Sequence, residues 1–110
     1  MELAIRSHGF SVTKALAERV RRRFSTALRH GADRLASVTI RLKDMNGPRR
    51  GGVDKQCGVE LQFANGNPIV VHETDSNLYV AIDRAADRTK RNLLDRLRQR
   101  RSRRRMRRQR

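Results

Sequence analysis

Arginine is the residue type in this sequence that most plainly carries chemistry, and it gathers at the C-terminal end. Residues 84–110 contain 14 of the 27 lysines and arginines but only two of the 11 aspartates and glutamates. The whole chain has a formal net charge of +16, and only four of its basic residues are lysine. Guanidinium groups form paired hydrogen bonds with phosphate oxygens and stack on bases. The composition therefore favours a polyanionic partner, nucleic acid above all.

The arginines of this segment recur at the spacing of an amphipathic helix. Asp75 or Ser76 can cap such a helix, because a short side-chain oxygen there accepts a hydrogen bond from the first turn. At about 100° per residue, one arc then carries Leu78, Ile82, Ala85, Ala86, Thr89, Leu93 and Leu97. The far side carries Arg84, Arg88, Arg91 and Arg98. We expect the apolar arc to pack on a core and the four arginines to contact phosphates.

Beyond Leu97 the apolar arc ends, and Met106 alone interrupts a run of Arg, Gln and Ser. Repulsion between neighbouring turns of like charge predicts fraying after about residue 100 in the free protein, with order gained on a polyanion. We therefore divide the chain into a folded domain, residues 1–98, and an arginine-rich tail, residues 99–110. A tail that only improves solubility is the alternative. The tail adds three candidate RNA contacts: Arg101, Arg104 and Arg105.

Two further pairs of arginines are candidate contacts. Arg22 and Arg29 point away from the apolar stripe of an earlier helix, where a merely solvated helix face is the alternative interpretation. Arg49 and Arg50 lie in the glycine-rich loop 46–52, whose backbone amides can approach an anion closely. This loop lacks the Lys-Ser/Thr ending and the following helix of a P-loop, so a flexible hairpin connection is an alternative of at least equal weight.

Residue types that support catalysis are present but are not grouped. His8, His30 and His72 stand apart, without the spacing of metal ligands. Cys57 is the single cysteine and falls on an inward strand position, where a buried, unreactive thiol is the common outcome. The acidic residues form no paired carboxylate motif. We therefore expect no enzyme, no metal ion and no cofactor.

The cellular compartment follows from similar observations. A lone cysteine cannot form an internal disulfide, which suits a reducing environment. The N-terminus has no apolar core of signal-peptide length, and no stretch approaches the roughly 20 apolar residues of a membrane span. We expect a cytoplasmic protein that does not enter a membrane.

Periodicity predicts the elements that position the arginines. Residues 2–7 alternate as a strand, and from Thr13 to about His30 apolar residues recur every three or four positions, as in a helix. An Asn-Gly turn at residues 65–68 predicts a hairpin. Alternation also predicts three more strands, at residues 35–43, 53–63 and 69–72.

The order β-α-β-β-β-α indicates an α+β two-layer sandwich. The helix between the first two strands predicts that they run parallel, and the hairpins make the other pairs antiparallel. Burial is satisfied most simply when both helices cover the same face of a four-stranded mixed sheet. At 110 residues, the chain is expected to form one compact unit.

Three runs in the final helix carry a family pattern: Asn77-Leu78-Tyr79-Val80-Ala81-Ile82-Asp83, Asp87-Arg88 and Arg91-Asn92-Leu93. They are similar to the Asp-x-Tyr-x-Ala-Ile-Asp, Asp-Lys and Arg-Gln-Leu runs of the ribosome hibernation-promoting factor and protein Y family of ribosome-associated inhibitors. The first helix, with Val12-Thr13-Lys14-Ala15-Leu16, also resembles that family. Two departures are Asn77, where the family has Asp, and Thr89, where it has Leu.

The resemblance implies a bacterial translation inhibitor of stationary phase or stress. It implies binding in the cleft of the small ribosomal subunit, where the protein occupies the path of messenger RNA and the tRNA sites. Arg88 and Arg91 match basic positions of the family and would contact ribosomal RNA, whereas Tyr79, Ala81 and Ile82 would be packing residues. The chain resembles the short members, which lack the dimerising C-terminal domain, so we expect a monomer off the ribosome.

Two other classes of function fit the charge. A general binder of double-stranded RNA is the main alternative, because double-stranded RNA-binding domains also place two helices on one face of a sheet. It predicts comparable affinity for naked duplex RNA. A protein that uses the basic tail on acidic lipid headgroups ranks last, because no apolar anchor lies beside the tail.

Overall fold

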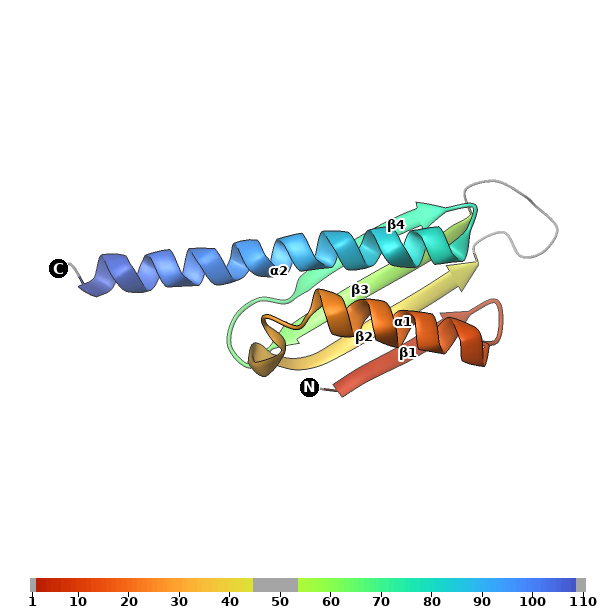
Figure 1. Ribbon diagram of the computed structural model, residues 1–110, viewed down its shortest axis with the longest axis horizontal. Coiled ribbons are helices and arrows are strands. Elements are labelled where there is room, and N and C mark those ends of the chain that lie inside the picture. Colours follow the sequence, from red (N-terminus) through yellow and green to blue (C-terminus); the bar gives the residue numbers. More distant parts are fainter. Residues whose placement is uncertain (1, 45–53, 109–110) are drawn as a thin grey trace.

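The computed structural model of the chain describes residues 2–44 and 54–108. Arg49, Arg50 and the rest of the glycine-rich loop 46–52 lie outside the described residues, so their predicted anion contact stays a prediction. The elements follow the expected order (Figure 1): β1 (Glu2–His8), α1 (Lys14–Ala27), the short 3-10 helix η1 (Ala32–Arg34), β2 (Leu35–Asp44), β3 (Lys55–Phe63), β4 (Ile69–Asp75) and α2 (Leu78–Arg108).

The four strands form one mixed sheet in the order β1-β2-β3-β4. β1 runs parallel to β2, with Ile5 opposite Ile40, while β2 with β3 and β3 with β4 are antiparallel. Gly66, in the turn between β3 and β4, has a φ of 111°, a backbone conformation that glycine adopts without steric cost. The predicted topology and the predicted Asn-Gly turn are both confirmed.

Both helices lie on one face of the sheet, as Figure 1 shows. The inward positions of the strands are buried against them, including Ile40, Leu61 and Val71. From the helices, the core receives Val20 and Phe24 of α1. The predicted arc of α2 is buried from Ile82 to Leu93, and its two end residues, Leu78 and Leu97, are partly buried against the same core. The α+β two-layer prediction is therefore confirmed.

The two helices begin at side-chain caps. Thr13 caps α1 as predicted, since the Leu16 N–H donates to Thr13 Oγ1 at 3.1 Å. The cap of α2 is Asn77, not Asp75 or Ser76 as the sequence suggested: the Tyr79 N–H donates to Asn77 Oδ1 at 2.9 Å. Asp75 instead accepts from the Asn77 N–H at 2.8 Å, so it fixes the turn that places the cap.

α2 continues well beyond the sheet. It has 31 residues, roughly 46 Å at the rise of an α-helix, and it extends alone past the β3–β4 turn (Figure 1). The helix passes unbroken through residues 98–99 to Arg108, and fraying of its end in solution stays a prediction. Arginine has high helix propensity, and the segment holds no glycine or proline.

Candidate nucleic-acid interface

Arginines of α1 bind carboxylates of α2 and join the two helices. Arg19 donates twice to Asp83, from Nη2 to Oδ2 at 2.7 Å and from Nε to Oδ1 at 3.2 Å. Arg23 donates from Nη2 to Asp87 Oδ1 at 3.1 Å, and its Nε forms an ion pair with Asp83 Oδ1 without hydrogen-bond geometry. The hydrogen bond from Arg19 lowers the pKa of Asp83 and raises that of Arg19. These two arginines are therefore occupied in holding the fold.

The predicted arginine stripe of α2 is divided by its ion pairs. Arg84 lies 3.3 Å from Asp75, and Arg88 lies 3.4 Å from Glu73, both carboxylates of β4. The Arg84 and Arg88 side chains keep exposures of 59% and 51%, so they can still meet a ligand. Each is partly neutralised at its own sheet edge, which weakens its pull on a polyanion.

The rest of the predicted arginines on α2 are exposed and unpaired. In the described part of the chain they make no ion pair. They therefore present uncompensated charge along the outer side and the extension of the helix. These residues are Arg91, Arg98, Arg101, Arg104 and Arg105. Arg22 on α1 and Arg29 just after it are exposed too, but they do not line the recess described next.

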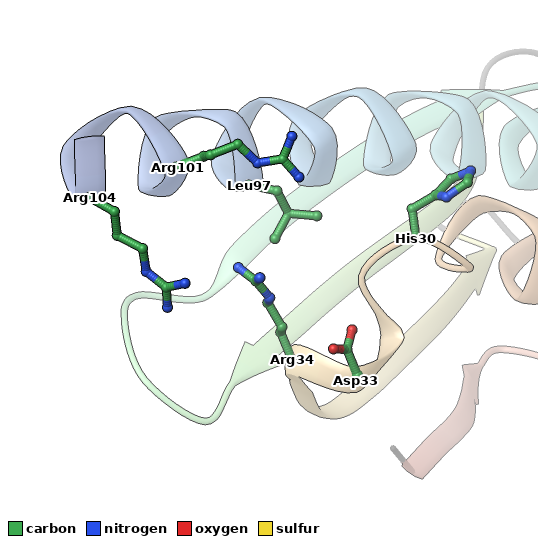
Figure 2. A pocket seen from close by; sticks show the side chains of 6 residues that line it. All are labelled: His30, Asp33, Arg34, Leu97, Arg101 and Arg104. Carbon is green, nitrogen blue, oxygen red and sulfur yellow. The ribbon is translucent and has the colours of Figure 1, made fainter. Parts of the chain in front are cut away.

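A recess of about 140 Å³ lies where α2 passes the connection from α1 to β2. Figure 2 shows Arg34 reaching up from the connection and Arg104 reaching down from α2. The lining consists of His30, Asp33, Arg34, Leu97, Arg101 and Arg104. A second hollow continues along α2 and shares three of these residues, adding Lys90, Leu94 and Arg98. The structure thus assembles a basic groove from two distant parts of the sequence.

Sequence reasoning missed Arg34 and His30 as members of this groove. Arg34 ends a 3-10 helix and has no periodic neighbours, so nothing local marks it. His30 stands apart from the other histidines in the sequence, so nothing local links it to an arginine cluster. Only the packing of α2 across the connection brings them to Arg101 and Arg104, and that contact has no signal in the sequence.

The extension of α2 is also held by arginines that the sequence analysis did not single out. Arg96 and Arg100 lie over the Phe63 ring, 5.1 and 5.0 Å from its centre. Arg96 donates to the carbonyl oxygen of Asn67 at 2.8 Å, and Arg100 donates to that of Asn65. These contacts fix the helix to the β3–β4 turn and so set the direction of the unpaired arginines beyond it.

Tyr79 corrects one expectation that the resemblance implied. Ala81 and Ile82 are fully buried, as expected of packing residues, but Tyr79 is 40% exposed. The guanidinium of Arg19 lies 5.6 Å from the centre of its ring, within the range of a cation–π contact. Tyr79 therefore packs against the Arg19 guanidinium at the surface and does not fill the core.

Cys57, the single cysteine of the chain, is fully buried. Burial raises the pKa of Cys57 to about 12, so this thiol is protonated at neutral pH. Within residues 2–44 and 54–108, no three His, Cys, Asp or Glu side chains come together as a metal site would require. No helix in this same part of the chain is long and apolar enough to span a membrane.

Comparison with known proteins places the chain in a family. The family model described as "Sigma 54 modulation protein / S30EA ribosomal protein" matches residues 3–102. The N-terminal domain of protein Y from Thermus thermophilus aligns with a TM-score of 0.69 and 21% identity, covering 84% of this chain and 96% of that one.

A ribosomal subunit interface protein from Coxiella burnetii aligns with a TM-score of 0.69 and 14% identity, over 86% of this chain and 96% of that one. At these identities the two structures show a shared fold. A comparison with curated sequences finds no significant match. The family model nevertheless covers almost the whole chain, which confirms the resemblance seen in the final helix. The chain belongs to the sigma 54 modulation protein and S30EA ribosomal protein family.

Proposed function

We propose that this protein binds the small ribosomal subunit and inhibits translation by occupying the path of messenger RNA and tRNAs. The family is one of ribosome-associated modulation factors, which supports the ribosome as the partner and the cytoplasm as the location. The action needs no catalysis, because a folded body that fills the path excludes RNA by volume alone.

The observation that carries the proposal is that five predicted arginines along α2 are exposed and form no ion pair with a described residue: Arg91, Arg98, Arg101, Arg104 and Arg105. Ribosomal RNA presents dense phosphate, and guanidinium groups bind phosphate oxygens in pairs. Because α2 is fixed to the sheet and to the β3–β4 turn, these groups are held at set spacings on a rigid rod. A fixed array of this kind suits the recognition of folded RNA by its shape.

Arg22, Arg29, Arg84 and Arg88 extend this surface in the proposal. Arg22 and Arg29 are exposed at α1, and Arg84 and Arg88 lie near the sheet edge with carboxylate partners. A phosphate that approaches Arg88 competes with Glu73 for its guanidinium. We therefore assign most of the binding free energy to the five α2 arginines without an ion pair. Arg22, Arg29, Arg84 and Arg88 contribute a smaller share. The protein acts as a monomer in this proposal.

Sedimentation with purified partners tests the proposal against the double-stranded RNA alternative. The protein is mixed at moderate salt with small subunits, large subunits, naked duplex RNA or DNA. We expect selective co-migration with the small subunit. Equal binding to all four partners would favour the general RNA-binding alternative and reject this one.

A pair of double variants shows which surface binds. Arg91→Glu/Arg98→Glu changes two unpaired arginines of α2, and we expect it to abolish co-migration. Arg6→Glu/Lys43→Glu makes the same change in charge at two exposed residues of the uncovered sheet face, and we expect it to retain most binding. Loss of binding in both variants alike would mean that net charge, and not this surface, drives the interaction.

A further inference from the structure

The recess beside the α1–β2 connection concentrates positive charge, because three arginines and a single carboxylate line it. Arg34 comes from η1, while Arg101 and Arg104 come from α2, and all three line the same recess of about 140 Å³. In the described residues none of the three is in an ion pair. Like charges held close repel one another, so an anion bound between them removes an unfavourable term. A phosphate group is small enough for the recess, and its oxygens match the geometry of guanidinium donors.

Asp33 adds an acceptor to this set of donors. Its side chain lines the recess and, as Figure 2 shows, extends from the connection beside Arg34. Although three guanidiniums share the recess, Asp33 makes no ion pair or hydrogen bond with any other described residue. The negative charge of a carboxylate repels an inorganic phosphate ion. A ligand that offers both a phosphate and a nearby hydroxyl donor matches both the three guanidinium groups and the carboxylate.

We propose that the recess binds one ribonucleotide unit of an RNA strand and makes this surface selective for RNA over DNA. Arg34, Arg101 and Arg104 bind the phosphate, and the carboxylate of Asp33 accepts a hydrogen bond from the ribose 2′-hydroxyl. Leu97 supplies the apolar wall against which the sugar packs. The inference rests on the proposed function, because RNA is the partner there. It adds the site at which the protein distinguishes ribose from deoxyribose.

Three short single-stranded probes of identical sequence test the proposal: RNA, DNA and 2′-O-methyl RNA, each carrying a fluorescent label. The 2′-O-methyl probe keeps an oxygen at the 2′ position but cannot donate a hydrogen bond. Dissociation constants of the full chain are measured by fluorescence anisotropy at one salt concentration. We expect the wild-type protein to bind RNA more tightly than both other probes.

Asp33→Ala isolates the carboxylate. Removing a negative charge raises affinity for every polyanion. The informative quantity is therefore the dissociation constant for DNA divided by that for RNA. Asp95→Ala is the matched control, because Asp95 is exposed, lies on α2 outside the recess and forms no ion pair with a described residue. We expect Asp33→Ala to lower the ratio about fivefold, and Asp95→Ala to leave it unchanged.

Arg34→Ala tests the phosphate half of the site. We expect weaker binding of all three probes, with a salt slope reduced by about 0.7 for a single strand. Equal affinity of the wild type for RNA and 2′-O-methyl RNA would overturn the proposal, and so would an unchanged ratio in Asp33→Ala. Sedimentation with small subunits is scored separately. Wild-type protein that binds subunits but shows no sugar preference refutes this inference alone, whereas sugar preference without subunit binding refutes the proposed function.

Discussion

At the scale of single residues, Asp83 of α2 links this helix to α1. It accepts from Arg19 and pairs with Arg23, and the side chains of this group are about one-third exposed. Solvent screens such pairs, and a typical contribution at this exposure is about 1 kcal/mol or less. These pairs connect α1 to α2 directly, between helices that both pack on the sheet.

Replacing Asp83 with Asn should therefore lower the free energy of unfolding by about 1 kcal/mol at neutral pH. The measurement is chemical denaturation followed by circular dichroism. Asp95→Asn is the control, because Asp95 is exposed and belongs to no ion pair in the described part of the chain. Equal stability of the two variants would show that the Asp83 contacts contribute nothing.

The Arg19–Asp83 ion pair makes the stability of the protein depend on pH. The pKa of Asp83 is lowered in the folded state, chiefly by the hydrogen bond from Arg19, from an ordinary value of 3.8. Its contribution is therefore fully present above pH 3.8 and is lost as the pH falls through the lowered, folded-state pKa. The difference in stability between wild type and Asp83→Asn should shrink over that acidic range. A difference that stays constant down to the most acidic pH at which the protein folds would refute this account.

Thr89 is a polar residue in the core. It is fully buried on α2, and its Oγ1 has no hydrogen-bond partner among the described residues. An unsatisfied buried hydroxyl is unfavourable, so Thr89→Val should raise the free energy of unfolding by about 1 kcal/mol. Thr26→Val is the control, since Thr26 is exposed and its hydroxyl donates to the Arg22 carbonyl at 3.2 Å. Thermal unfolding of both variants checks the expectation, and a destabilised Thr89→Val would contradict it.

At the scale of elements, α2 depends on an anchor outside its own sequence. Arg96 and Arg100 hold it against Phe63 and the carbonyls of the β3–β4 turn. Among the described residues, this anchor supplies the last hydrogen bonds from α2 to another element before the helix passes the recess lined by Arg101 and Arg104. The anchor formed by Arg96 and Arg100 holds Arg101 and Arg104 in position beside the recess.

Arg96→Ala/Arg100→Ala should therefore loosen the extension even though alanine has the higher helix propensity. We expect amide hydrogen exchange in residues 98–106 to become about fivefold faster, because two hydrogen bonds and two cation–π contacts are lost. Arg98→Ala/Arg105→Ala removes the same charge from exposed positions and should not speed exchange. If the two double variants exchange alike, the anchor has no role in ordering the extension.

The sequence predicts most of α2 but not its boundaries or its neighbours. The repeat of Ile82, Ala86, Leu93 and Leu97 determines which side is buried, since a 3.6-residue period leaves no other choice. The cap at Asn77 depends on turn geometry set by Asp75, which periodicity does not encode. Arg96 and Arg100 each follow a core residue by three positions, so the helical period already places them toward the sheet. Arg34 joins the groove only through tertiary packing.

At the scale of the whole molecule, charge and shape act together. The protein measures 61 × 23 × 19 Å, and its long dimension runs along α2. Among the described residues, α2 carries most of the arginines that form no ion pair, so much of the positive charge lies along a narrow rod. Such a shape can enter a channel walled by RNA and contact phosphates along its length.

Binding to the small subunit should therefore weaken steeply with salt. Each phosphate contact adds about 0.9 to the slope of log K against log salt on duplex-like sites. Arg91→Ala/Arg98→Ala should lower the slope by about 2, while Arg6→Ala/Lys43→Ala on the sheet face should leave it nearly unchanged. An equal slope in the wild type and the α2 variant would show that these two arginines do not contact phosphate.

The most direct test of occlusion is competition for the small subunit. Labelled messenger RNA is bound to purified small subunits, the protein is added in increasing amounts, and the bound messenger RNA is measured by filter retention. The proposed mechanism predicts that the protein displaces messenger RNA completely and that Arg91→Glu/Arg98→Glu does not. A stable complex that holds the protein and messenger RNA on the same subunit would contradict the mechanism.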